Sequence, residues 1–349
     1  MLTENAILLL KDLIEIESFS KNESGTANRL EHWFNINNIP FQRKDNNLWA
    51  INKAFNSEKP TLLLNSHHDT VEPNKAYTRD PFKADVIDGK LYGLGSNDAG
   101  GSLVSLLALF SYYYKHPNPE YNLLMVASAE EEIAGERGLR SLLSEIPKVD
   151  LAIVGEPTLM ELAIAEKGLI VFDIIIKGTP SHAAHPNDDN PLMKLPNIIK
   201  QIGNISFEKV SPILGPVKVT LTQIDAGNQH NVVPSEVKLV LDVRVNECYQ
   251  NEEIKELIEA AIPYDVRPRS LCLQSSCISE DHPLVIAGKK LGRATYGSPT
   301  LSDQAALRCS SLKLGPGDST RSHSANEYIY INEIETGINL YINLLKQIL

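Results

Sequence analysis

The apolar positions in the first half of the chain fall into short runs separated by a segment with helical periodicity. Residues 61–65 (TLLLN), 121–127 (YNLLMVA) and 151–154 (LAIV) have the length and composition of buried strands. Residues 102–114, between the first two runs, are apolar at helical spacing. Buried strands that alternate with helices are typical of a parallel sheet covered by helices. We therefore predict an α/β fold with a mostly parallel, mixed sheet flanked by helices.

The pattern changes in the middle of the chain. Strand-like runs occupy 169–176, 217–224 and 236–245, and the stretches around 191–205 and 252–262 are helix-like. The order strand, helix, strand, strand, helix is an α+β pattern that resembles half of a ferredoxin-like unit or more. The alternation of strands and helices then resumes near the C-terminus.

This change of pattern predicts a discontinuous catalytic domain, residues 1–166 and 275–349, with an inserted domain at residues 167–274. Within the catalytic domain, polar side chains come shortly after predicted strands. His67 lies two residues past the first run, and Glu156 lies two residues past the third. Because ligands of open α/β sheets gather at the carboxyl ends of the strands, we expect these side chains to share one site.

Composition excludes several classes of partner. The formal net charge of −11 argues against nucleic acid or an anionic membrane. No apolar run approaches the roughly 20 residues of a membrane helix, and Lys11 and Asp12 interrupt the N-terminal run, which favours an amphipathic helix over a signal peptide. The four cysteines form no CxxC pair, which is typical of unpaired thiols in a reducing compartment. We expect a cytoplasmic protein with a small-molecule partner.

Five short motifs supply metal-ligand chemistry. In SHHDTV, residues two apart point the same way on an extended chain, so His67 can be a ligand whose ring Asp69 orients, while His68 points away. Asp98 in GLGSNDAGG precedes a helix; a plain N-cap is the simpler explanation, but the surrounding glycines favour a crowded centre in which Asp98 bridges two ions. Together the five motifs supply two imidazoles and three carboxylates, from His67, Asp98, Glu132, Glu156 and His323, and this set suits a pair of Zn²⁺ ions.

The acid run in SAEEEIAG would by itself indicate a solvated face. Here it follows a strand and opens into a turn, so Glu132 can bind metal while Glu131 faces the attacking water. With Glu156 in VGEPT and His323 in STRSHSANE, the ligands are complete. Two Zn²⁺ ions with three carboxylates retain one positive charge, which favours acidified water at the site. Glu131 would accept the proton and pass it to the leaving nitrogen.

The inserted domain holds further candidates. His182 in GTPSHAAHP is unremarkable alone, and a metal pair with His185 has poor support from the three-residue spacing. Asn231 lies in GNQHNVVPSE. Arg244 ends a predicted strand, where a guanidinium can hold a substrate carboxylate bidentately, although a structural role remains open for each of these residues.

In this order, the motifs resemble those of the co-catalytic zinc amidohydrolase family that includes acetylornithine deacetylase, succinyl-diaminopimelate desuccinylase and carboxypeptidase G. The resemblance covers nearly the whole chain. It implies a zinc-binding catalytic domain and an inserted lid domain that usually forms the homodimer. It also implies two ligand sets, one of His67, Asp98 and Glu156 and one of Asp98, Glu132 and His323, with Glu131 as general acid and base.

The resemblance extends to the insert. The family's GxxxH loop matches residues 178–182, so that His182 would stabilise the oxyanion, in dimeric relatives at the partner's site. The GNxxNxxP segment matches at Asn231, and LDVR matches the strand that supplies a substrate-binding Arg, here Arg244.

The motifs GEPT and GPGDSTRSHSANEYI look most like the acetylornithine deacetylase branch. We therefore expect hydrolysis of the N-acyl bond of N-acetylornithine or a close acyl-ornithine or citrulline in arginine biosynthesis. The alternatives are a succinyl-diaminopimelate or acyl-lysine hydrolase, or a dipeptidase. Co²⁺ or Mn²⁺ could replace Zn²⁺ at such ligands. A protein that kept the fold but not the chemistry would have lost ligands, and here all five are present.

Overall fold

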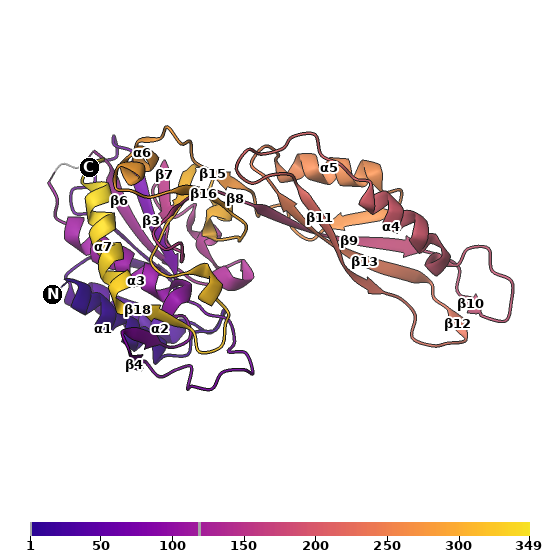
Figure 1. Cartoon of the computed structure of the whole chain (residues 1–349), viewed down its shortest axis with the longest axis horizontal. Coiled ribbons are helices and arrows are strands. Elements are labelled where there is room, and N and C mark those ends of the chain that lie inside the picture. The colour runs from indigo at the N-terminus through magenta and orange to yellow at the C-terminus, as the bar shows by residue number, and fades with distance from the viewer. Residues whose placement is uncertain (1, 118–119) are drawn as a thin grey trace. The chain divides into compact units, whose positions relative to one another are not determined.

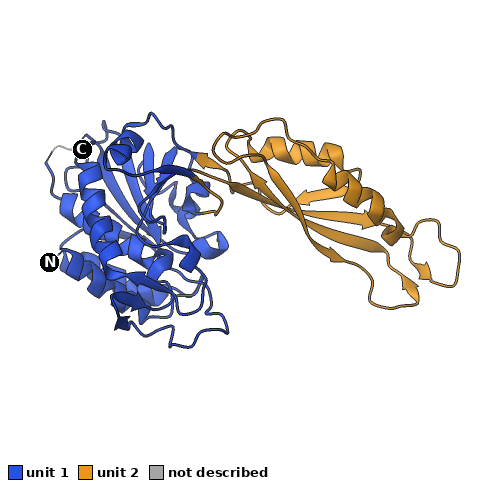
Figure 2. Cartoon of the chain, viewed as in Figure 1, with its two compact units in different colours: residues 1–164, 277–296, 302–349 blue, residues 165–276, 297–301 orange. Residues whose placement is uncertain are grey.

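The computed structural model describes residues 2–117 and 120–349, and the chain divides into two compact units (Figures 1 and 2). Unit 1 comprises residues 1–164, 277–296 and 302–349, and unit 2 comprises residues 165–276 and 297–301. The sequence placed these boundaries after residues 166 and 274, and it did not anticipate the short segment 297–301 in unit 2.

Unit 1 combines a large sheet with helices. Its helices are α1 (Leu2–Ile14), α2 (Ser24–Ile36), α3 (Gly101–Tyr113), α6 (Pro283–Lys290) and α7 (Ile331–Leu345). Its strands are β1 (Gln42–Lys44), β2 (Asn47–Ile51), β3 (Thr61–His67), β4 (Val86–Ile87), β5 (Lys90–Tyr92), β6 (Asn122–Ser128), β7 (Leu151–Val154), β17 (Ser310–Lys313) and β18 (Tyr328–Tyr330), and three more cross the unit boundary, β8 (Leu162–Glu166), β15 (Ser276–Cys277) and β16 (Thr295–Ser298).

The large sheet has the strand order β1-β2-β6-β3-β7-β17-β8-β15, with β16 beside β8. The neighbours β6, β3, β7 and β17 run parallel, whereas β2 joins β6 and β8 joins β17 in antiparallel pairs. Every residue of β3 is buried, as a central strand of a covered parallel sheet should be. Helices α1, α3 and α7 pack against one another, and the prediction of a mostly parallel mixed sheet with helices is confirmed.

The predicted amphipathic first helix is present as α1. Leu9, Leu10 and Leu13 are buried, while Asp12 lies on the outer side and accepts hydrogen bonds from Arg29. None of the helices in the described part of the chain is long and apolar enough to cross a membrane.

Unit 2 is a four-stranded antiparallel sheet with two helices. Its elements are β9 (Gly168–Lys177), β10 (Ser181–His182), α4 (Leu195–Gly203), β11 (Lys218–Asp225), β12 (Val232–Val233), β13 (Glu236–Val245), α5 (Asn251–Ala261) and β14 (Asp265–Pro268). The sheet order is β11-β13-β9-β14, and β10 pairs with β12. The sequence missed β14, which completes the β-α-β-β-α-β order of a ferredoxin-like unit.

Alternation along the strands explains how unit 2 folds. Along β9, buried positions such as Ile170, Phe172 and Ile174 alternate with half-exposed ones. The buried face packs against Ile198 of α4 and Ile254 of α5, so both helices cover the same side of the sheet (Figure 1).

Candidate metal centre

The carboxyl ends of the parallel strands place the candidate ligands at one edge of the sheet. Glu131 and Glu132 follow β6 in a 3₁₀ turn, and Glu156 comes just after β7. The expectation that His67 lies beyond its strand is wrong, because β3 continues through His67, which pairs with Ser128 of β6. The strand can extend over polar residues because these find partners; the Ser66 hydroxyl, for example, donates to the Gly155 carbonyl over 2.7 Å.

Asp98 lies between the two imidazoles. His67 Nε2 is 3.4 Å from Asp98 Oδ1, and His323 Nε2 is 3.6 Å from Asp98 Oδ2. Each oxygen of one carboxylate therefore faces a different ring. The preceding Gly95 has a φ of +74°, and a Cβ there would meet the Thr70 side chain at 2.6 Å, so a glycine is required where the loop turns.

The remaining acids divide between the two rings. On the His67 side, Nε2 is 3.8 Å from Glu156 Oε1 and 3.9 Å from Glu131 Oε2. On the other side, His323 Nε2 is 3.0 Å from Glu132 Oε2. The ligand atoms of two triplets also lie within 4.8 Å of one another, His67 with Glu131 and Glu156, and His67 with Asp98 and Glu132.

These spacings fit divalent cations. Two ligand atoms that are each about 2.0–2.1 Å from one tetrahedral ion lie roughly 3.4 Å apart. The separations between each imidazole and its predicted carboxylate ligands run from 3.0 Å to 3.8 Å. His67 Nε2 is buried and has no hydrogen-bond partner in the described chain, although it points into this group of carboxylates. A buried polar atom that faces three carboxylates and lacks a partner is well suited to bind a cation.

Charge explains the protonation equilibria of the cluster. Burial by itself would lower the pKa of His67, but the neighbouring carboxylates of Asp69, Asp98, Glu131 and Glu156 together outweigh it, and the pKa lies well above its ordinary value. The hydrogen bond to Glu132 raises the pKa of His323 to about 9, against the effect of burial.

The glutamates shift in the same direction. Burial raises the pKa of Glu131 well above its ordinary value, with the charge of His67 opposing and that of Glu156 adding to the rise. Burial also raises the pKa of Glu156, to about 8. Without a bound cation, the site therefore favours extra protons, which is the response expected of crowded carboxylates.

Asp69 orients His67 through its backbone rather than mainly through its carboxylate. His67 Nδ1 is 3.0 Å from the Asp69 carbonyl oxygen and 3.5 Å from Oδ1. The Asp69 carboxylate instead accepts the backbone N–H groups of Glu131 and Glu132, at 3.1 Å and 3.3 Å, and the Ser20 hydroxyl at 2.6 Å. Asp69 thus holds the turn that carries the acids as well as the ring.

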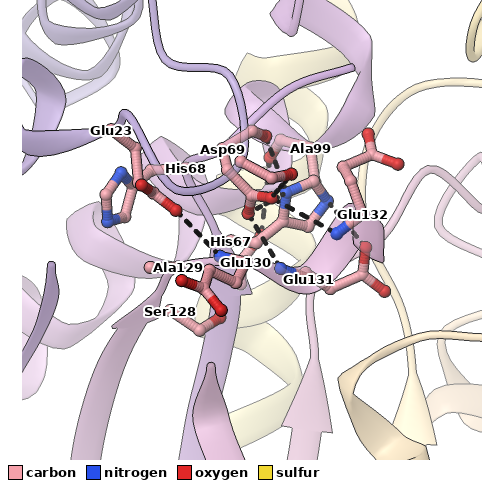
Figure 3. Close-up of polar contacts among 12 residues, drawn as sticks. Glu23, His67, His68, Asp69, Ala99, Ser128, Ala129, Glu130, Glu131 and Glu132 are labelled. Carbon is pink, nitrogen blue, oxygen red and sulfur yellow. Dashed lines mark hydrogen bonds and ion pairs between the residues drawn. The ribbon is translucent and has the colours of Figure 1, made fainter. Parts of the chain in front are cut away.

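A second buried acid continues this arrangement. The Glu23 carboxylate accepts the Glu130 N–H at 3.1 Å, so three consecutive backbone amides of the acid run point at buried carboxylates (Figure 3). His68 turns away from the cluster, as its position beside His67 predicts (Figure 3). Its Nδ1 is 2.9 Å from the Thr26 hydroxyl.

The three candidates of the insert all belong to unit 2, and the structure brings two of them together. The backbone N–H of Ala183, beside His182, donates to the Asn231 carbonyl over 2.9 Å. His182 Nδ1 accepts the Ala184 N–H over 3.1 Å, which leaves Nε2 to carry the proton of the neutral ring. Among the described residues, no group of three candidate ligands includes His182 or His185.

Arg244 lies in the four-stranded sheet, apart from His182, which lies in the separate pair of β10 and β12. It pairs with Leu169, near the start of β9, whereas His182 follows the end of β9 at Lys177, about 26 Å further along the strand. Its Nε and Nη2 atoms donate hydrogen bonds to the carboxylate of Asp242 at 2.9 Å and 3.1 Å. Only part of the guanidinium fork remains for a substrate.

Sequence reasoning missed three acids around the centre, the buried Glu23 and Glu327 and the half-buried Asp303. Asp303 accepts the Ser128 hydroxyl at 2.5 Å, and burial raises its pKa to about 6. Burial raises the pKa of Glu327 to about 8, and the nearby charge of Asp98 adds to the rise. Glu327 does stand inside STRSHSANE, the motif that contains His323, and this position was the available signal.

The model of Peptidase family M20/M25/M40 matches residues 63–347. Among curated proteins, a succinyl-diaminopimelate desuccinylase of Rickettsia bellii is 26% identical over 97% of this chain and 96% of its own length, and one of Wolbachia pipientis is 28% identical over 97% and 92%. Among solved structures, an M20 family metallo-carboxypeptidase of Sulfolobus solfataricus has a TM-score of 0.77 at 16% identity, covering 98% of both chains, and a tripeptidase of Staphylococcus aureus has 0.76 at 20%, covering 99% of this chain and 98% of its own.

Proposed function

Because this chain belongs to peptidase family M20/M25/M40, we propose that it hydrolyses the amide bond of an N-acylated amino acid at the centre around Asp98. The observation that carries the proposal is the Asp98 carboxylate, which faces His67 with one oxygen and His323 with the other. Glu131 lies beside this arrangement without being needed for the bridge.

The ligand roles follow from the distances. His67 and Glu156 would hold one divalent ion, Glu132 and His323 the other, and Asp98 both. When bound, such ions polarise the amide carbonyl and acidify water at the site. Zn²⁺ suits the mixed imidazole and carboxylate ligands, and Co²⁺ is an expected substitute.

Glu131 is the proposed general base and acid. Its carboxylate takes a proton from the attacking water while the oxygen adds to the carbonyl carbon, and it returns that proton to the nitrogen as the C–N bond breaks. The products are the free acid of the acyl group and the amine of the amino acid. Glu131 Oε2 lies 3.9 Å from His67 Nε2, so its carboxylate faces the centre at which the water would be held.

His182 would stabilise the oxyanion through Nε2–H, the tautomer that the Ala184 N–H favours by donating to Nδ1. Arg244 would hold a substrate carboxylate, and Asn231 would lie beside His182. Arg244 pairs with Leu169 near the start of β9, and His182 comes after the end of β9 at Lys177, which is about 26 Å along the strand from Leu169, so a single small substrate cannot meet both from the same copy. This separation supports a homodimer in which His182 serves the partner's centre.

A mixing experiment tests the dimer. We expect Glu131→Gln and His182→Ala each to be nearly inactive and folded. After subunit exchange, hybrid dimers would regain one complete site, so the mixture should reach roughly a quarter of wild-type turnover. If mixing adds nothing although hybrids form, His182 acts within its own chain or not at all.

The substrate is the finer part of the proposal. The similar curated proteins named above are succinyl-diaminopimelate desuccinylases, which supports an N-succinyl amino acid with a distal carboxylate and not the expected place in arginine biosynthesis. The motifs GEPT and STRSHSANE favour N-acetylornithine as the second candidate.

A substrate panel decides between them. Metal-loaded protein would be assayed with N-succinyl-diaminopimelate, N-acetylornithine, N-acetyl-lysine and simple dipeptides. We expect kcat/KM to be highest for the succinyl compound and to fall in Glu131→Gln for every substrate. Absence of hydrolysis across the panel by protein that holds two metal ions would refute the proposed activity.

A further inference from the structure

Glu327 is a buried carboxylate that faces backbone amides instead of the metal centre. It is 2% exposed and lies between His323 and strand β18. Its Oε1 accepts the N–H groups of Asn97 at 2.8 Å and Asp98 at 2.9 Å, and its Oε2 accepts the N–H of Gly95 at 3.2 Å. Both oxygens are therefore occupied by the loop that ends in Asp98.

These contacts fix the backbone from which the bridging carboxylate projects. Three N–H groups that converge on one carboxyl group form a cradle, and the hydrogen bonds that they donate hold both of its oxygens in place. The main chain of Glu327 adds to the cradle, because its carbonyl accepts the Gly93 N–H at 3.1 Å. The Asp98 backbone cannot rotate or shift without breaking several of these bonds.

A second bond pattern ties the same two segments together. The Asn97 side chain accepts the Asp318 N–H at 3.0 Å and donates to the Asp318 carbonyl at 3.1 Å. The Asp98 loop and the segment that carries His323 are thus joined on both sides of His323, at Asp318 and at Glu327. The two ligands that face each other at 3.6 Å belong to one braced substructure.

We propose that Glu327 is a positioning residue that sets the Asp98 carboxylate between the two imidazoles and thereby tunes the affinity of the metal pair. The inference deepens the proposed function, since it concerns the same centre. Glu327 is in neither of the ligand triplets found in the described chain, so its effect must pass through Asp98 and His323.

Metal titration of the folded protein tests the proposal without substrate. In Glu327→Gln, the amide oxygen can still accept from Asn97 and Asp98, but the NH₂ group faces the Gly95 N–H. In Glu327→Ala the whole cradle loses its acceptor. We expect the dissociation constants for Zn²⁺ and Co²⁺, measured by calorimetry on metal-stripped protein, to rise about 10–100-fold in Glu327→Ala and less in Glu327→Gln. The visible spectrum of the Co²⁺ protein should also change at saturating Co²⁺.

Asp150→Ala is the matched control for Glu327→Ala. Asp150 also accepts a backbone amide, the Thr61 N–H at 3.0 Å, but at the end of β3 away from His67. A lost carboxylate–amide bond should lower the melting temperature there while leaving metal affinity and the Co²⁺ spectrum unchanged. If Glu327→Ala does not fold, Glu327→Gln alone decides.

Wild-type affinity and spectrum in a folded Glu327 variant would overturn the inference and leave the proposed function standing. Conversely, weakened metal binding in that variant, together with no hydrolysis by the metal-loaded wild type, would support the positioning role and refute the activity. A wild-type protein that binds no divalent cation would overturn both.

Discussion

The two imidazoles of the centre are held by very different means. His67 ends a central strand, and its side chain is 1% exposed, whereas the His323 side chain is 54% exposed on a loop where the residue adopts a φ of 56°. The ladder between β3 and β6 fixes the first ring. The second depends on braces such as the Asn74 amide, which donates to the His323 carbonyl at 3.1 Å.

This difference separates the contribution of the ligands to the stability of the fold from their contribution to metal binding. The His67 side is built into the core, so its changes should affect folding and metal binding together. The His323 side is attached by hydrogen bonds and by the bidentate ion pair of Arg321 with Glu333, at 2.7 Å and 3.0 Å. Changes there should affect metal binding with little cost to the fold.

The largest effect is expected where the two sides meet. Asp98→Ala removes the carboxylate that faces both rings, so both ions should be lost and turnover should fall by about 10³-fold or more. Elemental analysis and initial rates measure this. Retention of two tightly bound ions would show that the sides are independent and that Asp98 is no bridge.

The second largest effect is expected from a variant that loses proton transfer and keeps both metal ions. Glu131→Gln keeps the shape of the side chain but cannot take a proton, so kcat should fall by about 10²–10⁴-fold at unchanged metal content. Near-normal turnover in the metal-loaded variant would assign the base elsewhere.

The comparison itself is tested by His67→Ala and His323→Ala in the metal-free protein. Loss of His67 leaves buried carboxylates without their cationic partner and should lower the free energy of unfolding by about 3–5 kcal/mol. Loss of the half-exposed His323 should cost at most about 1 kcal/mol, because solvent screens its pair with Glu132. Denaturant unfolding measures both. His32→Ala, which removes an exposed imidazole from α2, is the control.

Equal losses from the two histidine variants would contradict the distinction between a core-built side and a braced side. A destabilised His32→Ala would instead indicate that removal of any imidazole lowers stability in this chain.

The smallest expected effect is the pH dependence of the metal-free protein. Glu156 has its pKa raised from 4.5 to about 8, chiefly by burial, and His323 from 6.5 to about 9, chiefly by its bond to Glu132. A raised pKa in the folded state stabilises the fold below the unfolded value, and this stability is lost as pH rises through the folded value. Bound cations would take the place of the protons on Glu156 and His323, so the metal-loaded protein should not lose this stability as the pH rises. The gain in melting temperature on adding Zn²⁺ should therefore widen from about pH 5 to about pH 9, and a constant gain would contradict this linkage.

Much of the architecture could be predicted from the sequence because the spacing of apolar and polar residues within each short segment indicates a strand or a helix. The run LAIV became β7 with the predicted bounds, and the segments around β13 and α5 matched within a residue or so. The insert was recognised as α+β, but the short β14 was missed, since four residues that include Pro268 carry almost no strand signal. The candidate ligands could be proposed because each stands in a short motif, and the structure brings their side chains close together.

The contacts that hold those ligands were decided only by the tertiary structure. The bond from Asp98 to Glu327 spans 229 positions of the chain, and the bond from Glu130 to Glu23 spans 107. An acidic residue whose carboxylate would bind a metal ion and one whose carboxylate accepts backbone N–H groups look alike in a sequence. Which role each acid takes depends on what folding brings within 3 Å or so of its oxygens, and short-range patterns carry no record of that distance.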